Sequence, residues 1–309
     1  MAAGDLPEFV VLADEVASAL RRGDPVVALE SAVVSHGLPP PTGLETAGML
    51  EAEVRKAGVV PATVAVVDGR VVVGATAGEL RRLADPSAWK IAERDLAVAV
   101  AAGACGGTTV SATVAVAEAA GIAVMSTGGI GGVHLGAEQT WDVSADLPAL
   151  ARHSAIVVCA GAKAICDTAR TLEYLETAGV TAVAYGTDRF PNFYLPDGGY
   201  PAPRRIDRPA EAAAILRNKR RLRQPGAVLV ANPIPTGEAL TPDEVAQAVS
   251  EARARVGALR GGEVTPALLD ALGRITGGRT LRANLALLRA NAVLAAAIAC
   301  EAAQESLQR

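Results

Sequence analysis

Aromatic residues make up only 3% of the 309-residue chain, although 50% of its residues are hydrophobic. A core with so few rings must be built from Ala, Val, Leu and Ile, which suits sheets covered by helices with small residues at their contacts. The chain also has no large excess of either charge, because its formal net charge is only −4. The composition therefore argues against a nucleic-acid-binding or membrane-binding surface.

Cysteine is scarce, and the four cysteines show neither CxxC spacing nor a disulfide pattern. They lie in apolar segments, which predicts buried free thiols. No apolar run reaches the length that spans a bilayer. The N-terminal stretch MAAGDLPEFVVLADEV carries acids where a signal peptide carries bases, so we expect a cytoplasmic protein.

Lysine is rare as well, with four residues among the 29 basic ones. Lys56 and Lys219 lie in charged helical stretches that are typical of solvated faces. Lys90 and Lys163 instead have apolar or small neighbours. Lys163 has either a chemical role or a structural role in a buried ion pair. Lys90 either binds phosphate or has a structural role of the same kind.

Lys163 stands in the stretch SAIVVCAGAKAICD. The run 155–159 predicts a strand buried on both faces, and the small residues 160–162 allow a ligand to approach closely. We expect a helix to begin just after the lysine. A helix N-terminus and an apolar wall both favour the neutral amine, which can attack a carbonyl and form a Schiff base.

The order of the elements predicts the fold. Buried strands are expected at 25–31, 121–126, 155–159, 181–186 and 226–231, and Asp68-Gly69 joins two alternating runs into a hairpin. Helices are expected at 8–22, 44–57, from 79, from about 108, after Lys163 and almost throughout beyond 241. We predict an α/β protein with three α/β/α layers and a mixed central sheet, forming a single domain over 1–309 with a helical part at about 240–309.

Polar side chains follow several of these strands. Glu30 closes the strand at 25–31, either as a cap for nearby amides or as an acid or base with a raised pKa. Thr127 and His134 lie in the glycine-rich loop after 121–126, which does not fit the dinucleotide fingerprint. Asp142 and Asp146 either share a divalent cation or a sugar hydroxyl, or cap the next helix.

Two further segments have candidate binding residues. Thr108, Thr109 and Ser111 stand at a helix start, where an anion such as phosphate and plain capping are equally supported. The loop after 181–186 holds Phe190, Phe193 and Tyr194. These rings could stack on a planar ligand or simply anchor the loop.

From about residue 25 to 294 the chain resembles the pseudouridine-5′-phosphate glycosidase family, which includes the indigoidine synthase A proteins. The resemblance rests on separated stretches that recur in register: VALESAVVSHGLPPP, GGTTVSATVAVAEAAGI, STGGIGGVHLGAEQTWDVSADL, VVCAGAKAICD, TLEYLETAGV, YGTDRFPNFY, ANPIPTGEAL, GGEVTP and ANLALLRANA. The segment that contains Lys90, KIAERDL, departs from the family pattern. It has Ala92 and Glu93 where the family usually has a hydroxyl side chain and a basic side chain.

The resemblance implies reversible cleavage of the C–C bond of pseudouridine 5′-phosphate to uracil and ribose 5-phosphate. It implies a homotrimer with one Mn²⁺ per subunit. Lys163 matches the Schiff-base lysine, Glu30 the proton donor and Asp142 the metal ligand. The implied substrate-binding residues, with Asp146 also assisting ring opening, are Lys90, Thr109, Val110, Thr127, His134, Ser144, Ala145, Asp146, Asn284 and Asn291.

Two other functions remain open at this point. The first is a Schiff-base aldolase that acts on a sugar phosphate, and the second is a non-catalytic nucleotide-binding relative. A C-glycosidic bond has no leaving heteroatom that simple protonation can release. The lysine and the carboxylic acid therefore fit the glycosidase reaction best.

Overall fold

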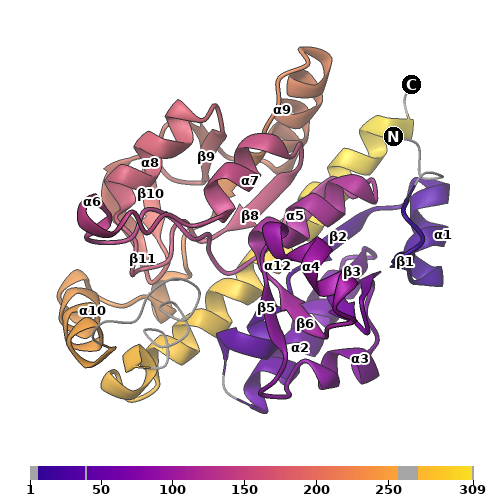
Figure 1. Ribbon diagram of the computed structural model, residues 1–309. Coiled ribbons are helices and arrows are strands. Elements are labelled where there is room, and N and C mark those ends of the chain that lie inside the picture. The colour runs from indigo at the N-terminus through magenta and orange to yellow at the C-terminus, as the bar shows by residue number, and fades with distance from the viewer. Residues whose placement is uncertain (1–5, 39, 257–270, 308–309) are drawn as a thin grey trace.

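The structure, a computed structural model, describes residues 6–38, 40–256 and 271–307. Within these ranges, one 11-stranded sheet has the order β1-β4-β3-β2-β7-β8-β13-β9-β12, with β6 paired to β3 and β5 paired to β6 (Figure 1). Its strands are β1 Val10–Leu12, β2 Val26–Leu29, β3 Val60–Val67, β4 Arg70–Val73, β5 Trp89–Ile91, β6 Gly106–Thr108, β7 Val124–Ser126, β8 Ile156–Cys159, β9 Thr181–Tyr185, β12 Arg205–Ile206 and β13 Val228–Ala231. The strands β10 Arg189–Asn192 and β11 Leu195–Pro201 form a separate pair.

The sheet is mixed, as predicted. The neighbours β2, β7, β8, β13 and β9 run parallel to one another. β3 is antiparallel to β4 and to β6. The Asp68-Gly69 turn joins β3 to β4, so the hairpin prediction is confirmed.

Helices cover both faces of the sheet. They are α1 Asp14–Arg22, α2 Thr42–Lys56, α3 Ala77–Arg82, α4 Leu96–Ala101, α5 Val110–Ala119, α6 Ala137–Thr140, α7 Asp146–Arg152, α8 Thr168–Thr177, α9 Pro209–Arg221, α10 Pro242–Val256 and α12 Arg279–Leu307, with the 3₁₀ turn η2 at Glu93–Asp95. The long α12 contacts α2 and α9 on one face, whereas α7 contacts α5 and α8 on the other (Figure 1). The predicted three-layer α/β/α fold is thus confirmed.

α12 corrects one expectation from the sequence. It is long and apolar enough to cross a membrane by length and composition alone, although no such run was expected. It packs against β2, β7 and β8, and Leu287, Ala292 and Ile298 along it are fully buried. Its apolar composition therefore serves the core of the fold.

Three other expectations differ in detail. Residues 10–12 at the start of the predicted first helix pair with β4 as an edge strand, because they alternate in burial before the helix begins at Asp14. Gly106 and Gly107 lie in β6, so the next helix begins at Val110. Part of the predicted C-terminal helical region, including the GGEVTP stretch, lies outside the described residues.

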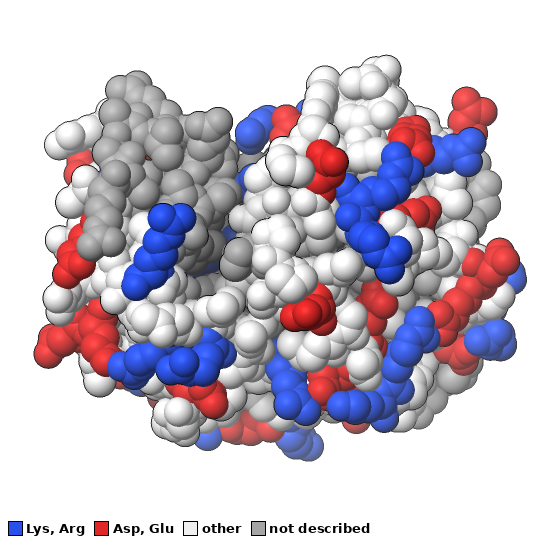
Figure 2. All heavy atoms as spheres, turned by 90° about the horizontal axis from the view of Figure 1, so that it is seen from below, with Lys and Arg blue, Asp and Glu red and all other residues white. Residues whose placement is uncertain are grey.

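Charged side chains are interspersed over the face of the molecule that Figure 2 shows. Lys and Arg alternate there with Asp and Glu, and no large area of one sign appears. This distribution agrees with the small net charge of the sequence.

Candidate active site

The register of three parallel strands brings the main candidate residues together. Leu29 at the end of β2 pairs with Ser126 at the end of β7, and Ser126 pairs with Val158 on β8. The residues that follow therefore leave the sheet side by side at its carboxyl edge. In open α/β sheets this edge is where ligands bind.

A cavity of about 740 Å³ opens at this edge. Its walls include most of the residues that the sequence singled out: Glu30, Lys90, Thr109, His134, Asp142, Ser144, Ala145, Asp146, Lys163 and Asn284. The structure does not bring Val110, Thr127 or Asn291 to the cavity wall. The volume is within the range of small-molecule sites.

Lys163 reaches the cavity from a loop and not from a helix start. α8 begins at Thr168, and Asp167 caps it by accepting a hydrogen bond from the Arg170 N–H at 3.0 Å. The expectation that a helix dipole acts on Lys163 is therefore wrong. The half-buried side chain lines the cavity, and within the described residues its Nζ has neither a hydrogen bond nor an ion pair with another side chain.

The glycine-rich loop after β7 holds the backbone of this lysine. The Ile130 N–H donates to the Gly161 carbonyl at 3.1 Å, and the Lys163 N–H donates to the Ile130 carbonyl at 2.9 Å. Gly161 has a φ of +87°, and a Cβ there would lie 2.0 Å from the Pro191 carbonyl oxygen. These bonds extend the β7–β8 pairing beyond the strands, which fixes the place where the lysine leaves the chain.

Glu30 faces the same cavity from the end of β2, and Thr127 donates a hydrogen bond to its carboxyl group. Burial raises the pKa of Glu30, while the Lys163 charge and the Thr127 hydrogen bond oppose that effect. A carboxyl group with a raised pKa can hold a proton and deliver it. Thr127 therefore acts on the site through Glu30.

Asn291 lies behind the site. Its Nδ2 donates to the carbonyl oxygens of Thr127 at 2.8 Å and Gly128 at 3.2 Å, and its Oδ1 accepts from Asn232 at 3.1 Å. The side chain is fully buried on α12. Asn291 thus anchors the loop that carries Thr127, and Asn284 is the α12 asparagine that lines the cavity.

Asp146, which is 5% exposed, ties two walls of the cavity together. One carboxylate oxygen accepts from the Ser111 N–H at 3.0 Å and the other from the Gly131 N–H at 2.8 Å. A Cβ on Gly131 would lie 2.1 Å from the Ser144 Oγ, so this close approach needs glycine. Both oxygens of Asp146 therefore bind backbone amides, which fixes the orientation of its carboxylate.

These bonds also change the expected phosphate site. The amides of Thr108, Thr109 and Ser111 donate to Ser31 Oγ, the Ile91 carbonyl and the Asp146 carboxylate. The prediction that these helix-start amides hold a phosphate is therefore wrong for all three. The Asp146 carboxylate already occupies the place of the anion at this helix start.

Cationic side chains line the cavity beside this helix. Lys90 on β5 reaches it, and burial, assisted by the Lys163 charge, lowers the pKa of Lys90 to about 8. Arg94 on η2 and His36 also line the wall. Sequence reasoning missed Arg94, although its place on the turn after the strand that carries Lys90 was a usable signal.

Asp142 and His134 occupy another part of the wall. The His134 Nδ1 lies 3.8 Å from an Asp142 carboxylate oxygen, and the His134 N–H donates to the Asp142 carbonyl at 3.0 Å. Burial lowers the pKa of His134, which favours the neutral ring. Across the described residues no group of three or more His, Cys, Asp or Glu side chains is placed to hold a metal ion.

Of the three candidate stacking rings, only Phe193 lines the cavity. Its ring contacts the Tyr194 ring edge-on, with the ring centroids 4.8 Å apart. Phe190, Phe193 and Tyr194 are all at most 2% exposed. The three rings therefore anchor the loop in the core, and Phe193 adds only a small apolar area to the cavity wall.

A lysine and a buried carboxyl group that face one cavity at the carboxyl edge of an α/β sheet form the site of an enzyme that acts on a small molecule. The family model described as indigoidine synthase A like protein matches residues 15–301, and the chain belongs to this family.

Curated relatives and solved structures agree with this assignment. The chain is 52% identical to a pseudouridine-5′-phosphate glycosidase of Methylobacterium nodulans, over 93% of this chain and 86% of that protein. It is 49% identical to that of Symbiobacterium thermophilum, over 92% and 95%. The prealnumycin C-glycosynthase AlnA in complex with ribulose 5-phosphate matches 98% of this chain and 100% of its own, with a TM-score of 0.90 and 37% identity. An indigoidine synthase A-like protein of Thermotoga maritima matches 99% of each chain, with a TM-score of 0.88 and 33% identity.

Proposed function

We propose that this protein cleaves, reversibly, the C–C glycosidic bond of pseudouridine 5′-phosphate to give uracil and ribose 5-phosphate. The observation that carries the proposal is the pair formed by Lys163 and Glu30, an amine and a buried carboxyl group that face one cavity. Relatives of about half sequence identity that carry the name pseudouridine-5′-phosphate glycosidase support the choice of substrate.

In this mechanism the C1′–O4′ bond of the ribose breaks as the Lys163 amine bonds to C1′, and O4′ leaves as a hydroxyl by taking the proton that the nitrogen loses. As the C–C bond breaks, the nitrogen lone pair forms the C=N bond of a Schiff base. The electron pair of the broken bond stays with the uracil carbon, which takes a proton from Glu30. Water then hydrolyses the Schiff base, which frees the lysine and ribose 5-phosphate.

Asp146 assists ring opening in this scheme from its position beside Ser144 on the cavity wall. The backbone amides that bind its two oxygens fix its orientation. Phe193, which is 2% exposed, adds a small apolar area that the uracil can contact, and Asn284 and Thr109 offer polar contacts around the cavity.

The phosphate lies against Lys90 and Arg94. An ammonium and a guanidinium on adjacent elements attract a dianion. Lys90 is largely buried, whereas the Arg94 side chain is exposed and pairs with Asp95 at 3.5 Å, so Arg94 must turn from Asp95 towards the phosphate. The pKa of about 8 for Lys90 makes this contact sensitive to mild alkali. Ribulose 5-phosphate bound to a related C-glycosynthase supports a pentose phosphate in this fold.

A Mn²⁺ ion at Asp142, one per subunit, belongs to the same proposal. Asp142 offers a carboxylate on the cavity wall with a neutral imidazole nearby, which fits an ion that is held by one or two protein ligands and several waters. The ion would supply a positive charge that orders water beside the sugar. The residues fit Mg²⁺ equally well, so metal titration decides between the two.

We further propose a homotrimer located in the cytoplasm. Large apolar side chains are exposed on the described surface, among them Trp141 at 85% and Val98 at 57%, and a subunit interface would cover such side chains. All four cysteines are free thiols, as expected in a reducing compartment. Sedimentation analysis tests the assembly, and a mass other than three chains contradicts it.

Incubation of the purified protein with pseudouridine 5′-phosphate and Mn²⁺ tests the reaction directly. We expect uracil and ribose 5-phosphate to appear in equal amounts. A Schiff-base aldolase would trap a sugar phosphate without releasing uracil, and a non-catalytic relative would bind nucleotide without turnover. Either of these results contradicts the proposal.

A further inference from the structure

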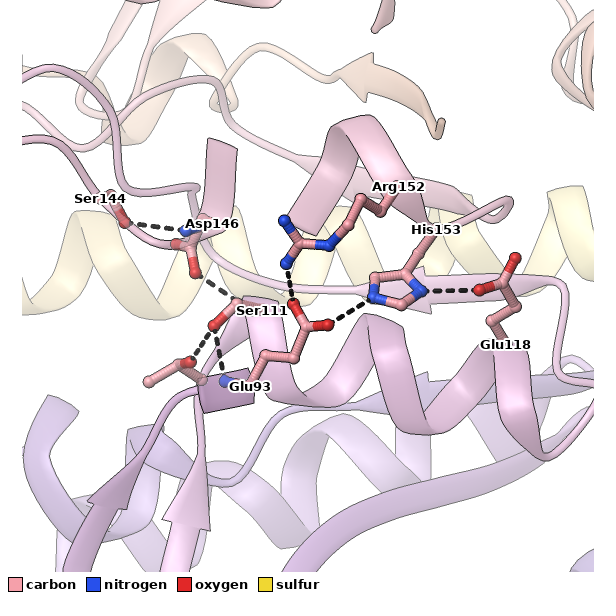
Figure 3. Close-up of polar contacts among 8 residues, drawn as sticks. Glu93, Ser111, Glu118, Ser144, Asp146, Arg152 and His153 are labelled. Atoms are coloured by element: carbon pink, nitrogen blue, oxygen red, sulfur yellow. Dashed lines mark hydrogen bonds and ion pairs between the residues drawn. The ribbon is translucent and has the colours of Figure 1, made fainter. Parts of the chain in front are cut away.

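A network of charged side chains lies behind one wall of the cavity, where η2, α5 and α7 meet (Figure 3). Glu93 on η2 accepts hydrogen bonds from the Arg152 Nη2 at 2.5 Å and the His153 Nε2 at 2.9 Å. His153 makes a second contact, from Nδ1 to a Glu118 oxygen on α5 at 2.6 Å. We call Glu93, His153 and Glu118, with Arg152, the rear network.

The rear network is joined directly to the wall that carries the phosphate-binding side chains. Ala92, Arg94 and Asp95 line the cavity, whereas Glu93 points the other way, towards the end of α7 (Figure 3). The Glu93 N–H donates to the Ser111 Oγ at 3.2 Å. The turn is therefore fixed both through its backbone and through the Glu93 side chain.

The other end of α7 reaches the same cavity. Asp146 is the first residue of α7, and Arg152 is its last, directly before His153. The Ser111 amide that binds Asp146 belongs to the residue whose hydroxyl accepts from Glu93. A shift of the rear network would thus be transmitted to η2 and to the Asp146 end of the cavity together.

The contacts of His153 depend on its protons. Each ring nitrogen faces a carboxylate oxygen, and an imidazole can donate to two acceptors only when both nitrogens carry hydrogen. The charged groups around it are Glu93 on η2, Glu118 on α5 and Arg152 on α7, and Arg220 on α9 acts on the environment of Glu118. The His153 side chain is only 16% exposed, so water competes weakly for these contacts.

We propose that His153 is a positioning residue: through Glu93 it holds the η2 turn so that Arg94 meets the phosphate of the substrate. The identity of that substrate rests on the proposed function, but the positioning itself needs only a phosphate ester in the cavity. Loss of the His153 contact would free one oxygen of the Glu93 carboxylate. The turn would then loosen, and phosphate binding would weaken.

The first test is calorimetric binding of ribose 5-phosphate to the wild type, to His153→Gln and to Asp188→Asn as a control. Asp188 forms an exposed ion pair with Arg205 away from the cavity walls. We expect His153→Gln to weaken binding about tenfold at pH 6, with no change in Asp188→Asn. The same His153→Gln substitution in an Arg94→Gln background should weaken binding no further, because His153 acts on the phosphate through Arg94.

A purely structural role for His153 would weaken binding by the same factor with Arg94 present or replaced, and that result overturns the proposal, as does equal binding of wild type and His153→Gln at pH 6. Failure of uracil release alone would overturn the proposed function and leave this binding test valid.

Glu93→Gln covers the case in which His153→Gln does not fold. Glutamine has nearly the shape of glutamate but loses the charge that Arg152 and His153 contact. We expect Glu93→Gln to weaken binding of ribose 5-phosphate, with no further loss when it is combined with Arg94→Gln. Equal binding of ribose 5-phosphate to Glu93→Gln and to wild type overturns the proposal.

Discussion

Thr127→Val gives the sharpest test of Glu30 as the proton donor. Thr127 donates a hydrogen bond to the Glu30 carboxyl group, and this bond lowers the Glu30 pKa against the stronger effect of burial, which raises it. Valine has nearly the same shape as threonine and donates nothing. The substitution therefore removes a contact that favours the charged carboxylate, and the Glu30 pKa should rise further.

The size of the shift follows from the strength of that bond. A hydrogen bond to a charged group contributes about 1.5–3 kcal/mol, and one pKa unit corresponds to about 1.4 kcal/mol. We therefore expect Thr127→Val to disfavour the charged carboxylate by about 1.5–3 kcal/mol, which raises the Glu30 pKa further. An acid catalyst is active only while protonated, so the alkaline limb of the kcat profile should move to higher pH.

The assay is uracil release at saturating pseudouridine 5′-phosphate across the pH range. Saturation matters because Lys90, with a pKa of about 8, affects phosphate binding and hence KM. Thr113→Val serves as the matched control, because it removes a buried threonine hydroxyl that lies outside the cavity wall and does not contact Glu30. If the alkaline limb of the kcat profile in Thr127→Val lies at the same pH as in wild type, or at lower pH, the assignment of Glu30 as the acid is refuted.

Three further predictions concern the rest of the site. Lys90→Gln should raise KM for the phosphorylated substrate more than tenfold and abolish the rise in wild-type KM above about pH 8; an unchanged KM contradicts the phosphate assignment. Asn291→Leu leaves two polar groups without partners, the Thr127 carbonyl and the Asn232 amide, because the Gly128 carbonyl still accepts from the Ala160 N–H. At about 1–3 kcal/mol each, thermal denaturation should show a loss of roughly 2 kcal/mol or more, whereas Asn284→Leu on the same helix should mainly weaken binding; equal melting temperatures in the two variants contradict this account. Chelation should lower activity that Mn²⁺ restores, and Asp142→Asn should need a much higher Mn²⁺ concentration; the same Mn²⁺ response in Asp142→Asn and wild type contradicts the metal assignment.

The sequence predicted the layers of the fold because its hydrophobic periodicity is strong. Buried runs such as the one before Lys163 and the Asp68-Gly69 turn report local preferences that the tertiary structure keeps. Side chains at the ends of adjacent parallel strands were predicted for the same reason. Glu30 and Lys163 meet because the strands that precede them share one sheet edge.

Contacts between distant segments could not be predicted in this way. The Ser111 amide looked available for a phosphate, but it binds Asp146, which lies 35 residues further along the chain. Asn291 reaches the Thr127 carbonyl across 164 residues, so its anchoring role depends on how α12 packs. The helix expected at Lys163 begins instead at Thr168, because the intervening residues pair with the glycine-rich loop.

The most direct measurement of the central claim is borohydride reduction in the presence of ribose 5-phosphate, followed by peptide mass spectrometry. The account predicts one reduced pentose phosphate adduct, attached to Lys163, and its absence from a folded Lys163→Ala protein that releases no uracil. An adduct on Lys90, no adduct on the wild type, or uracil release by Lys163→Ala would contradict it.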